Sequence, residues 1–407
     1  MRILIVCYHP PDKGGLAINT HIIAQGLKKF GHYVVMASTE NYPGIKTFVF
    51  GRYRKNPIFV LNNFYLKHFL SKIVKREKID IIHAQDRLTS IAAISASKKE
   101  KIPCVIHFHD YWFACPKGNL LRYDLSECSG VNFFHCCRCM LGKRFLWEFY
   151  KFFFLVKTSW KKLEKADVKI AVSKCVMEKL SRCGIQTNVR VLHNPVTDIF
   201  FKDMDESRKN QVKRKYNLKK NVVSYFGEFS LNKGIFLLCD VIKELHKDKR
   251  ITETSFLVIG WGKLEKYIIS FIKKNNLSNV VFLPRVNPHK IRNFYAISNI
   301  IVIPSIWPDP LPRVAEEALS MGIPVISSNI GGLKDLVENN KTGFLIIPGD
   351  KRRLKDSIVN LTLNPLLRHK FSENAKQNAV GRFNKDIIVR ALIKIYQDCL
   401  KGTKKIK

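Results

Sequence analysis

The chain has 407 residues, of which 46% are hydrophobic, so it exceeds one ordinary core and suits about two domains. Its formal charge of +37 favours anionic partners, namely nucleic acid, acidic lipid headgroups or phosphorylated small molecules, although a lysine-rich solvated surface explains the same value. The apolar start, ILIV, meets prolines and charged residues within a few positions, which excludes a secretory signal or a membrane span there. The sequence therefore predicts a cytoplasmic protein whose eleven cysteines are reduced thiols.

The first half of the chain alternates apolar runs with helical stretches. Residues 2–38 predict a buried strand, a glycine-bearing loop, an amphipathic helix and a second strand, which is a βαβ opening. The runs IDIIHAQD (79–86), PCVIHFHD (103–110) and KIAVS (169–173) each end in polar residues. Continuous apolar runs of this kind are typical of a parallel sheet that is covered on both faces.

A charged stretch, KDMDESRKNQVKRKYNLKK (202–220), interrupts this alternation, which restarts at NVVSYFGEF (221–229). Further apolar runs follow in the second half, namely SFLVIG, VVFLPRV, NIIVIPS, PVISS and GFLIIP. We therefore predict an α/β fold of two Rossmann-like doubly wound domains that face a cleft, with the boundary near residue 197. In such sheets ligands bind beyond the carboxyl ends of the strands, so the loops after each run are where chemistry is expected.

The stretch WPDPLPRVAEEAL (307–319) combines a proline-rich loop with a strong helix pattern. Its prolines exclude a helix before residue 312, and Pro312 suits the first helical position. Asp309 then lies on the loop and Glu317 on the helix. Two carboxylates can accept hydrogen bonds from sugar hydroxyls, while the free amides and the dipole of the helix start favour phosphate. The pattern predicts a nucleotide-sugar site, with Glu316 rather than Glu317 as the solvated glutamate of the helix.

Five segments together resemble one known family. They are DKGGL (12–16), HFHDYWFACP (107–116), FGEFSLNKG (226–234), PSIWPDPLPRVAEEALSMGIPVISSNIGG (304–332) and ENNKTGFLIIPGD (338–350). They occur in the expected order and span nearly the whole chain. The sequence is similar to the retaining glycosyltransferases of family 4, which have the two-domain GT-B fold.

The resemblance implies that Asp309 and Glu317 form the Glu-x7-Glu pair of the family, in which Glu317 binds the donor ribose and residue 309 faces the donor hexose. Aspartate is one methylene shorter than the usual glutamate, so donor preference cannot be copied from the family. Glu228 stands where the family usually has an arginine, which places more of the phosphate binding on Lys233. The donor-binding positions that the resemblance implies are Gly14, Gly15, Lys233, Pro310, Leu311, Pro312 and Glu317.

A family histidine near the donor sugar and the acceptor matches His109, so His109 and Asp309 are the predicted catalytic residues. The alternative is that His109 has a purely structural role. His107 is the competing candidate for the catalytic role. The only Asp-x-Asp spacing, at 203–205, lies in the charged linker rather than at a strand end. We therefore expect metal-independent transfer, in which positive side chains and helix starts neutralise the leaving diphosphate.

The same resemblance assigns a role to each part of the chain. Residues 1–196 are expected to form an acceptor-side domain, residues 197–385 a nucleotide-sugar donor domain, and residues 386–407 a helix that crosses back to the first domain. A cysteine-rich insertion over 115–139 contains a Cys-x-x-Cys spacing. Packed or redox-sensitive thiols explain it as well as a structural zinc does, and the candidate zinc ligands are Cys115, Cys128, Cys136 and Cys139.

The stretch GKRFLWEFYKFFFLVKTSWKKLEK (142–165) interleaves aromatic residues with lysines. It is too short and too charged to span a bilayer, but it suits an interface where lysines meet anionic headgroups. An aromatic core helix explains the pattern equally well. With the basic charge, it predicts a peripheral protein on the inner face of the cell membrane.

The sequence as a whole predicts a retaining hexosyltransferase. It would move a sugar from a UDP- or GDP-linked donor to a hydroxyl of a glycan or lipid-linked acceptor, in the assembly of cell-surface polysaccharide or lipopolysaccharide. The alternative is a nucleotide-sugar-binding or scaffold protein that has lost turnover, which Glu228 and Asp309 keep open. Nucleic acid is not an expected partner, because charge alone supports it and no recognisable module is present.

Overall fold

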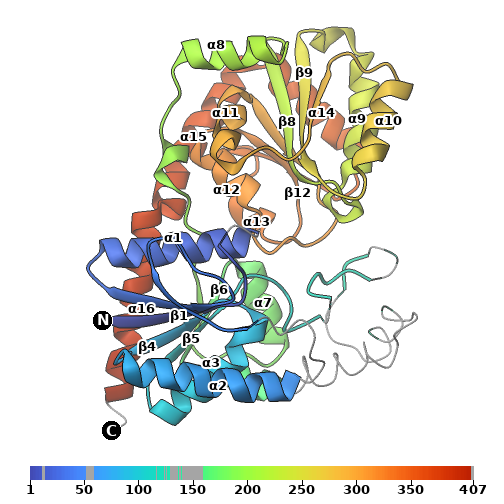
Figure 1. Cartoon of the computed structure of the whole chain (residues 1–407). Coiled ribbons are helices and arrows are strands. Elements are labelled where there is room, and N and C mark those ends of the chain that lie inside the picture. Colours follow the sequence, from blue (N-terminus) through green and yellow to red (C-terminus); the bar gives the residue numbers. More distant parts are fainter. Residues whose placement is uncertain are drawn as a thin grey trace. The chain divides into compact units, whose positions relative to one another are not determined.

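The computed structural model describes residues 1–11, 14–51, 59–115, 117–122, 124, 126–128, 136, 139 and 159–404. The chain divides into two compact units (Figure 1). The first combines Met1–Pro195 with Lys385–Lys407, and the second is Val196–Asn384. Each unit is built around one parallel sheet.

The sheet of the first unit has seven strands in the order β3-β2-β1-β4-β5-β6-β7, and every neighbouring pair is parallel. Its inner strands are almost wholly buried, which is why they appear in the sequence as continuous apolar runs. In chain order the strands are β1 (Arg2–Cys7), β2 (Tyr33–Ser38), β3 (Lys46–Val49), β4 (Ile81–Ala84), β5 (Cys104–Phe108), β6 (Val168–Ala171) and β7 (Val189–Val191).

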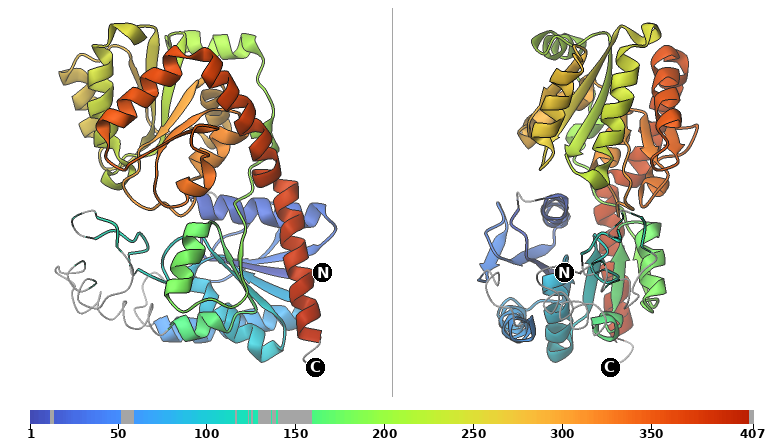
Figure 2. Two further views of the ribbon diagram at one scale, coloured as in Figure 1. Left: turned by 180° about the vertical axis from the view of Figure 1, so that it is seen from behind. Right: turned by 90° about the vertical axis from the view of Figure 1, so that its right-hand side faces the viewer.

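Helices cover both faces of this sheet (Figures 1 and 2). On one face α1 (Gly15–Lys29) and the C-terminal helix α16 (Lys385–Lys404) pack side by side over one hydrophobic cluster. They approach so closely that a Cβ on Gly26 would lie 2.6 Å from Cγ2 of Val389. The other face is covered by α2 (Phe59–Arg76) and α3 (Arg87–Glu100). Shorter helices of this unit are α6 (Trp160–Glu164) and α7 (Lys174–Arg182).

The sheet of the second unit has six parallel strands in the order β10-β9-β8-β11-β12-β13. The strands are β8 (Asn221–Glu228), β9 (Thr254–Trp261), β10 (Val280–Leu283), β11 (Ile300–Ile303), β12 (Val325–Ser328) and β13 (Gly343–Ile346). The core on one face is built with α9 (Ile235–His246), α10 (Glu265–Lys274), α14 (Lys351–Leu363) and α15 (Pro365–Phe383). The remaining helices are α8 (Glu206–Lys215), α11 (Pro288–Ile297), α12 (Arg313–Ser320) and α13 (Leu333–Leu336), with 3₁₀ turns η4 (Asp198–Phe201), η5 (Leu231–Lys233) and η6 (Lys249–Ile251).

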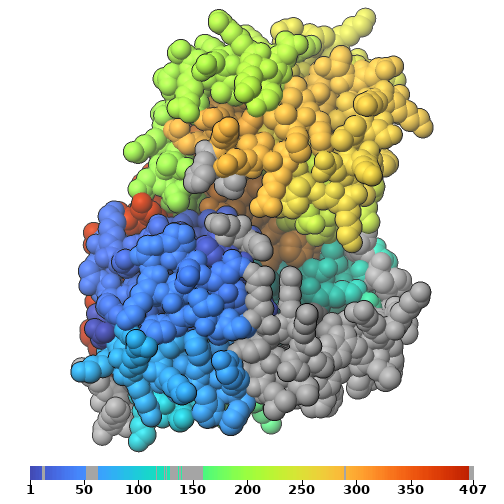
Figure 3. Space-filling model, viewed as in Figure 1, coloured from blue at the N-terminus to red at the C-terminus, as the bar shows by residue number. Residues whose placement is uncertain are grey.

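Helix α8 has no buried side chain, and its residues lie at the surface of the unit (Figure 3). It contains most of the charged stretch that the sequence shows between the two alternating halves. The aspartate at its start, Asp205, accepts a hydrogen bond from the backbone amide of Arg208, so one member of the Asp-x-Asp pair is a helix cap. No helix in the described part of the chain is both long and apolar enough to cross a bilayer.

The two parallel sheets confirm the predicted doubly wound α/β class. Helix α12 begins at Arg313 with Pro312 as its cap, one residue later than predicted, because Pro312 is in an extended conformation. Strands β3 and β7 were not predicted. They are the edge strands of the first sheet, and their partly exposed residues give no continuous apolar run.

Candidate active site

Lys233 and Asp309 form an ion pair beyond the carboxyl ends of the strands of the second sheet. Lys233 ends the turn η5, which follows β8, and Asp309 lies on the loop between β11 and α12. The ammonium donates to the carboxylate and lies 5.0 Å from the centre of the Trp307 ring. Only 9% of the Asp309 side chain is exposed, against 24% of the Lys233 side chain. A ligand can therefore reach the ammonium more easily than the carboxylate.

The loop that holds Asp309 rests on two glycines, and this contact fixes its position. The amide of Gly332 donates to the backbone carbonyl of Asp309 at 2.7 Å. A Cβ on Gly332 would lie 2.0 Å from the carbonyl oxygen of Pro310, and one on Gly331 would lie 2.5 Å from that of Asp309. Lys233 is placed in the same way, since a Cβ on Gly234 would lie 1.9 Å from the carbonyl oxygen of Pro304. Only glycine fits at these three positions.

Gly332→Ala should therefore displace the loop at Pro310 and weaken nucleotide binding. Because the clash is with backbone rather than with a flexible side chain, we expect the dissociation constant of the tightest nucleotide to rise by roughly 10–100-fold, measured by isothermal titration calorimetry. Gly381→Ala is the control, because it lies on α15 with no atom within 4 Å of the added Cβ. Equal affinities in Gly332→Ala and wild type would contradict this account of the loop.

Glu317 is held on α12 by two donors. The hydroxyl of Tyr295 donates to Oε2 at 2.9 Å, and Nη2 of Arg313, one turn earlier on the helix, donates to Oε1 at 2.9 Å. Burial, and then the charge of Glu317, holds the pKa of Tyr295 well above its ordinary value, so the hydroxyl keeps its proton and remains a donor. The carboxylate is 13% exposed and is held in one orientation.

The prediction that Glu316 is the solvated glutamate of this helix is wrong. Glu316 is fully buried. Burial lowers the pKa of Arg382, and the negative charge of Glu316 is among those that oppose this shift; the Arg382 guanidinium donates to the backbone carbonyl of Asp335. Adjacent helical positions point about 100° apart, and the sequence alone does not show which of the two faces the protein interior.

Near the carboxyl ends of β8 and β9, the second sheet carries both an acidic and a basic side chain. Glu228, at the end of β8, is exposed, and the guanidinium of Arg285 lies 4.9 Å from the centre of the Trp261 ring at the end of β9. The backbones of β8 and β9 approach so closely here that a Cβ on Gly260 would lie 1.8 Å from the carbonyl oxygen of Gly227. Glu228 is therefore an exposed acid at the carboxyl end of β8.

In the first unit, His109 lies directly after β5 with its ring partly exposed. Its Nε2 is 2.9 Å from Oε1 of Gln85, which follows β4. Burial lowers the pKa of His109 to about 3, although a hydrogen bond to the side chain of Asn194 opposes this shift. His109 is therefore a neutral, oriented ring at physiological pH.

His107, on β5, is 1% exposed, and neither ring nitrogen has a hydrogen-bond partner in the described part of the chain. Its ring lies between those of His83 and His109, with centroid distances of 5.5 and 4.2 Å. This inaccessible ring cannot contact a substrate, so of the two histidines only His109 is open to one.

Two buried carboxyl groups lie in the loops around His109. Asp86 caps α3 by accepting from the amides of Leu88 and Thr89, and it also accepts from the amide of Tyr8 at 2.6 Å. Burial raises its pKa. Burial also raises the pKa of Asp110 to about 6, although Asp110 accepts from the amide of Trp112. The sequence shows both residues at strand ends but does not distinguish a cap from a binding group.

Gly14 and Gly15 begin α1. Gly14 has φ of +91°, which favours glycine, and no side chain caps this helix start. Both glycines are exposed. Asp12 and Lys13, which complete the DKGGL motif, lie outside the described residues.

The predicted zinc site is not present among the described residues, where no group of three or more His, Cys, Asp or Glu side chains is arranged to hold a metal ion. The Sγ of Cys115 is 3.9 Å from Oδ1 of Asn119, and the amide of Cys128 donates to the carbonyl of Leu120. The predicted ligands Cys115, Cys128, Cys136 and Cys139 therefore do not form a metal-binding group among the described residues. Cys137 lies outside the described residues.

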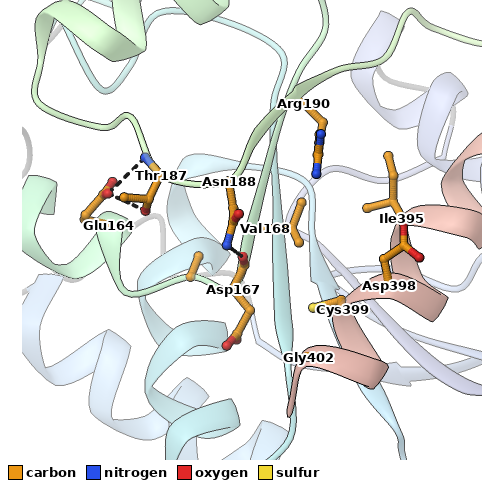
Figure 4. A pocket seen from close by; sticks show the side chains of 11 residues that line it. Glu164, Asp167, Val168, Thr187, Asn188, Arg190, Ile395, Asp398, Cys399 and Gly402 are labelled. Carbon is orange, nitrogen blue, oxygen red and sulfur yellow. Dashed lines mark hydrogen bonds between the residues drawn. The ribbon is translucent and has the colours of Figure 1, made fainter. Parts of the chain in front are cut away.

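The first unit also contains a cavity of about 510 Å³, and none of the candidate site residues lines it. It is bounded by the amino ends of β6 and β7 and by the last turns of α16 (Figure 4). Thr187 donates to Glu164 and Asn188 donates to the carbonyl of Asp167 along one wall, while Arg190 and Asp398 line another part. Because ligands of parallel α/β sheets bind at the carboxyl ends of the strands, we do not place the active site here.

Comparison with known proteins connects this geometry with a family. The family model described as Glycosyltransferase Family 4 matches residues 13–198, and the one described as Glycosyl transferases group 1 matches residues 206–378. The chain belongs to the family 4 glycosyltransferases. This glycosyltransferase therefore transfers a sugar from a nucleotide sugar, in a family that retains the anomeric configuration.

Relatives match this glycosyltransferase over most of its length. An uncharacterized glycosyltransferase of Methanocaldococcus jannaschii is 28% identical over 98% of both chains. An Escherichia coli UDP-Gal:alpha-D-GlcNAc-diphosphoundecaprenol alpha-1,3-galactosyltransferase is 25% identical over 80% of this chain and 76% of its own. Among solved structures, Anabaena HepE in complex with UDP and glucose has a TM-score of 0.74 and 20% identity, covering 98% of this chain and 99% of its own.

Several residues of the site were not found from the sequence of this glycosyltransferase. Tyr295 and Arg313 hold Glu317, and Gln85 and Asn194 hold His109. Arg313 carries a detectable signal, because it lies four residues before Glu317 on a helix. The others come from distant positions and give no local pattern.

Proposed function

We propose that this glycosyltransferase moves a hexose, with retention, from a UDP- or GDP-linked donor to a hydroxyl of a glycan or lipid-linked acceptor. The observation that carries the proposal is the arrangement of Lys233, Asp309 and Glu317 around the carboxyl edge of the second sheet. A buried carboxylate, an accessible ammonium and an oriented glutamate are the groups that a sugar, a diphosphate and a ribose require.

In this proposal Glu317 accepts hydrogen bonds from the ribose hydroxyls, and its two donors prevent it from rotating away. Asp309 accepts from the hexose. Lys233 leaves Asp309 for the diphosphate and neutralises the charge that develops on the leaving group as the glycosidic bond breaks. The starts of α12, at Pro312, and of α1, at Gly14 and Gly15, offer backbone amides to anionic oxygens. His109 orients the acceptor or the hexose as a neutral group.

Cell-surface polysaccharide or lipopolysaccharide assembly is the setting we propose. The support is the activity of the Escherichia coli relative and the similarity in fold to WaaG, a glycosyltransferase involved in lipopolysaccharide biosynthesis, at 16% identity and a TM-score of 0.66. Peripheral attachment to the inner face of the membrane rests on the basic charge and on residues 142–165. Most of that stretch lies outside the described residues.

Thermal shift across UDP, GDP, ADP and their common sugar conjugates tests the donor site. A ligand at about 100 times its Kd adds about 2.7 kcal/mol, which raises Tm by roughly 5–10 °C. We expect this shift for one nucleoside diphosphate in wild type and in Glu373→Ala, an exposed glutamate of α15, and its loss in Glu317→Ala. A shift that persists in Glu317→Ala would remove Glu317 from the site.

Two features favour the alternative of a binding or scaffold protein without turnover. Asp309 is already paired with Lys233, and the exposed Glu228 opposes a diphosphate. Release of the nucleoside diphosphate separates the two readings. A stabilising diphosphate whose sugar conjugate is never turned over, with any acceptor tested, would establish the alternative.

A further inference from the structure

A chain of hydrogen bonds connects the C-terminal helix α16 with His109 inside the first unit. The hydroxyl of Tyr396, on α16, is 2.6 Å from Nδ1 of His83 on β4. The side-chain amide nitrogen of Gln85 lies 3.0 Å from Nε2 and 3.1 Å from Nδ1 of the same ring. The other end of that carboxamide is 2.9 Å from Nε2 of His109. Four side chains thus connect α16 to a predicted catalytic histidine.

Tyr396 determines which nitrogen of His83 carries the proton. Tyr396 and His83 are both fully buried. Burial holds the pKa of Tyr396 well above its ordinary value and lowers that of His83 to about 3, so the phenol keeps its proton and the imidazole is neutral. In the described part of the chain, His83 is the one hydrogen-bond partner of the hydroxyl. The phenol therefore donates to Nδ1, and the single proton of His83 lies on Nε2.

This proton then orients Gln85. The two ends of a carboxamide are nearly isosteric, so the hydrogen-bond network decides which end faces which partner. His83 offers its Nε2 proton, so we assign the carboxamide oxygen to the end that faces His83 and the NH2 group to the end that faces His109, which exchanges the two isosteric ends relative to the atoms named above. In the reverse arrangement His83 would donate to Tyr396, and the buried phenol proton would have no acceptor. Leaving such a donor unsatisfied costs about 1–3 kcal/mol.

The orientation of the Gln85 carboxamide determines which ring nitrogen of His109 carries the proton. Its Nε2 accepts from the NH2 group of Gln85, so its own proton lies on Nδ1. The side chain of Asn194 hydrogen-bonds His109, and its carboxamide can present its oxygen to the ring proton because its two ends are nearly isosteric. Because Nε2 faces Gln85, that bond belongs to Nδ1. Both nitrogens then have the partner that their protonation requires.

We propose that Tyr396 is a positioning residue for sugar transfer, which acts through His83 and Gln85 to keep His109 in the Nδ1-protonated tautomer and in one ring orientation. The proposal rests on the proposed function for the role of His109 in transfer. Its structural part, the tautomer, is independent of that role. His107 stacks between the two outer rings and spaces them.

The test compares wild type with Tyr396→Phe, using the full chain labelled with ¹⁵N-histidine. The ring ¹⁵N chemical shifts of His109, assigned from the signals lost in His109→Gln, report its tautomer directly. We expect the Nδ1-protonated form in wild type and a mixture of tautomers in Tyr396→Phe. With an active donor and acceptor, kcat should fall on the order of tenfold. The KM for the donor should change little, because Lys233, Asp309 and Glu317 lie in the other unit.

Leu392→Val is the matched control, because Leu392 lies one turn earlier on α16, is fully buried and makes no side-chain hydrogen bond. It should lose stability without changing the tautomer. If Tyr396→Phe does not fold, Gln85→Met breaks the same chain at the carboxamide and gives the same NMR readout. An unchanged tautomer in the variant that folds, or an Nε2-protonated His109 in wild type, overturns the proposal. Absence of turnover in wild type instead contradicts the proposed function, and the tautomers still decide the role of Tyr396.

Discussion

Replacing Lys233 with methionine is expected to lower kcat/KM for sugar transfer by about 100-fold or more. Methionine keeps the length of the side chain but removes the ammonium that would neutralise the leaving diphosphate. The loss is large because Glu228, at the end of the preceding strand, is an acid and cannot substitute for the missing charge. Steady-state kinetics of nucleoside diphosphate release give the comparison. Most of the effect should fall on kcat, because the charge develops in the transition state.

Lys247→Met is the matched control, because Lys247 is exposed and lies beyond the far end of α9, the helix that follows Lys233. It makes the same change of charge and should leave kcat/KM within about twofold of wild type. Glu228→Arg tests the same argument in the opposite direction and should strengthen diphosphate binding. If Lys233→Met and Lys247→Met transfer at equal rates, the diphosphate does not contact Lys233.

Unfolding of the first unit should become easier as the pH falls, because of the histidine stack. The folded state holds the pKa of His83 and of His109 at about 3 and that of His107 well below its ordinary value, all mainly through burial. The unfolded chain protonates these rings near pH 6.5. From there down to about pH 3 the unfolded state binds more protons, so each histidine lowers stability by about 1.4 kcal/mol per pH unit. This loss is absent above pH 6.5.

His107→Leu isolates one of these contributions. Because the ring nitrogens of His107 have no hydrogen-bond partner among the described residues, leucine removes a titrating group and no hydrogen bond. As the pH falls from 7.5 to 4.5, the variant should gain unfolding free energy relative to wild type, by at most about 1.4 kcal/mol per pH unit below pH 6.5, measured by urea denaturation. Asp86 and Asp110 have raised pKa values and oppose the trend, but they are present in both proteins and largely cancel.

Phe108→Leu is the control for packing, because Phe108 is the fully buried neighbour of His107 on β5 and does not titrate. Its effect on stability should be the same at both pH values. A pH-independent difference between His107→Leu and wild type would mean that the folded protein accepts a proton at His107 as readily as the unfolded chain.

The strands of the two sheets could be predicted wherever both faces are buried. Strands such as β1, β5 and β9 consist of buried residues and therefore appear as continuous apolar runs. The edge strands β3 and β7 lack this pattern, because water reaches one side of them. A continuous apolar run therefore indicates a strand that is buried on both faces, and a strand with an exposed face does not show it.

The candidate site was predictable only where neighbours in the sequence are neighbours in the fold. The loop at 307–312 and the helix after it form one local unit, so Asp309 and Glu317 could be named from their spacing. The partner that decides the state of His83 is 313 residues away, and no local pattern indicates it. The prediction that Glu316 is solvated was wrong for a related reason, because the surroundings of its side chain include Arg382 on a helix distant in the sequence. The zinc prediction relied on the spacing of cysteines in the sequence, which does not fix where their side chains lie in the fold, and no metal-binding group is found among the described residues.

The membership of α16 in the first unit has a consequence for the order of folding during synthesis. Residues 196–384 form a continuous unit, which can complete its core as soon as they leave the ribosome. The first unit cannot, because Val389, Leu392 and Tyr396 belong to its hydrophobic cluster and are made last. Until then the part of the sheet face that α16 covers, beside α1, is exposed to water. The unit whose synthesis begins before the other is therefore the unit that completes its core after the other.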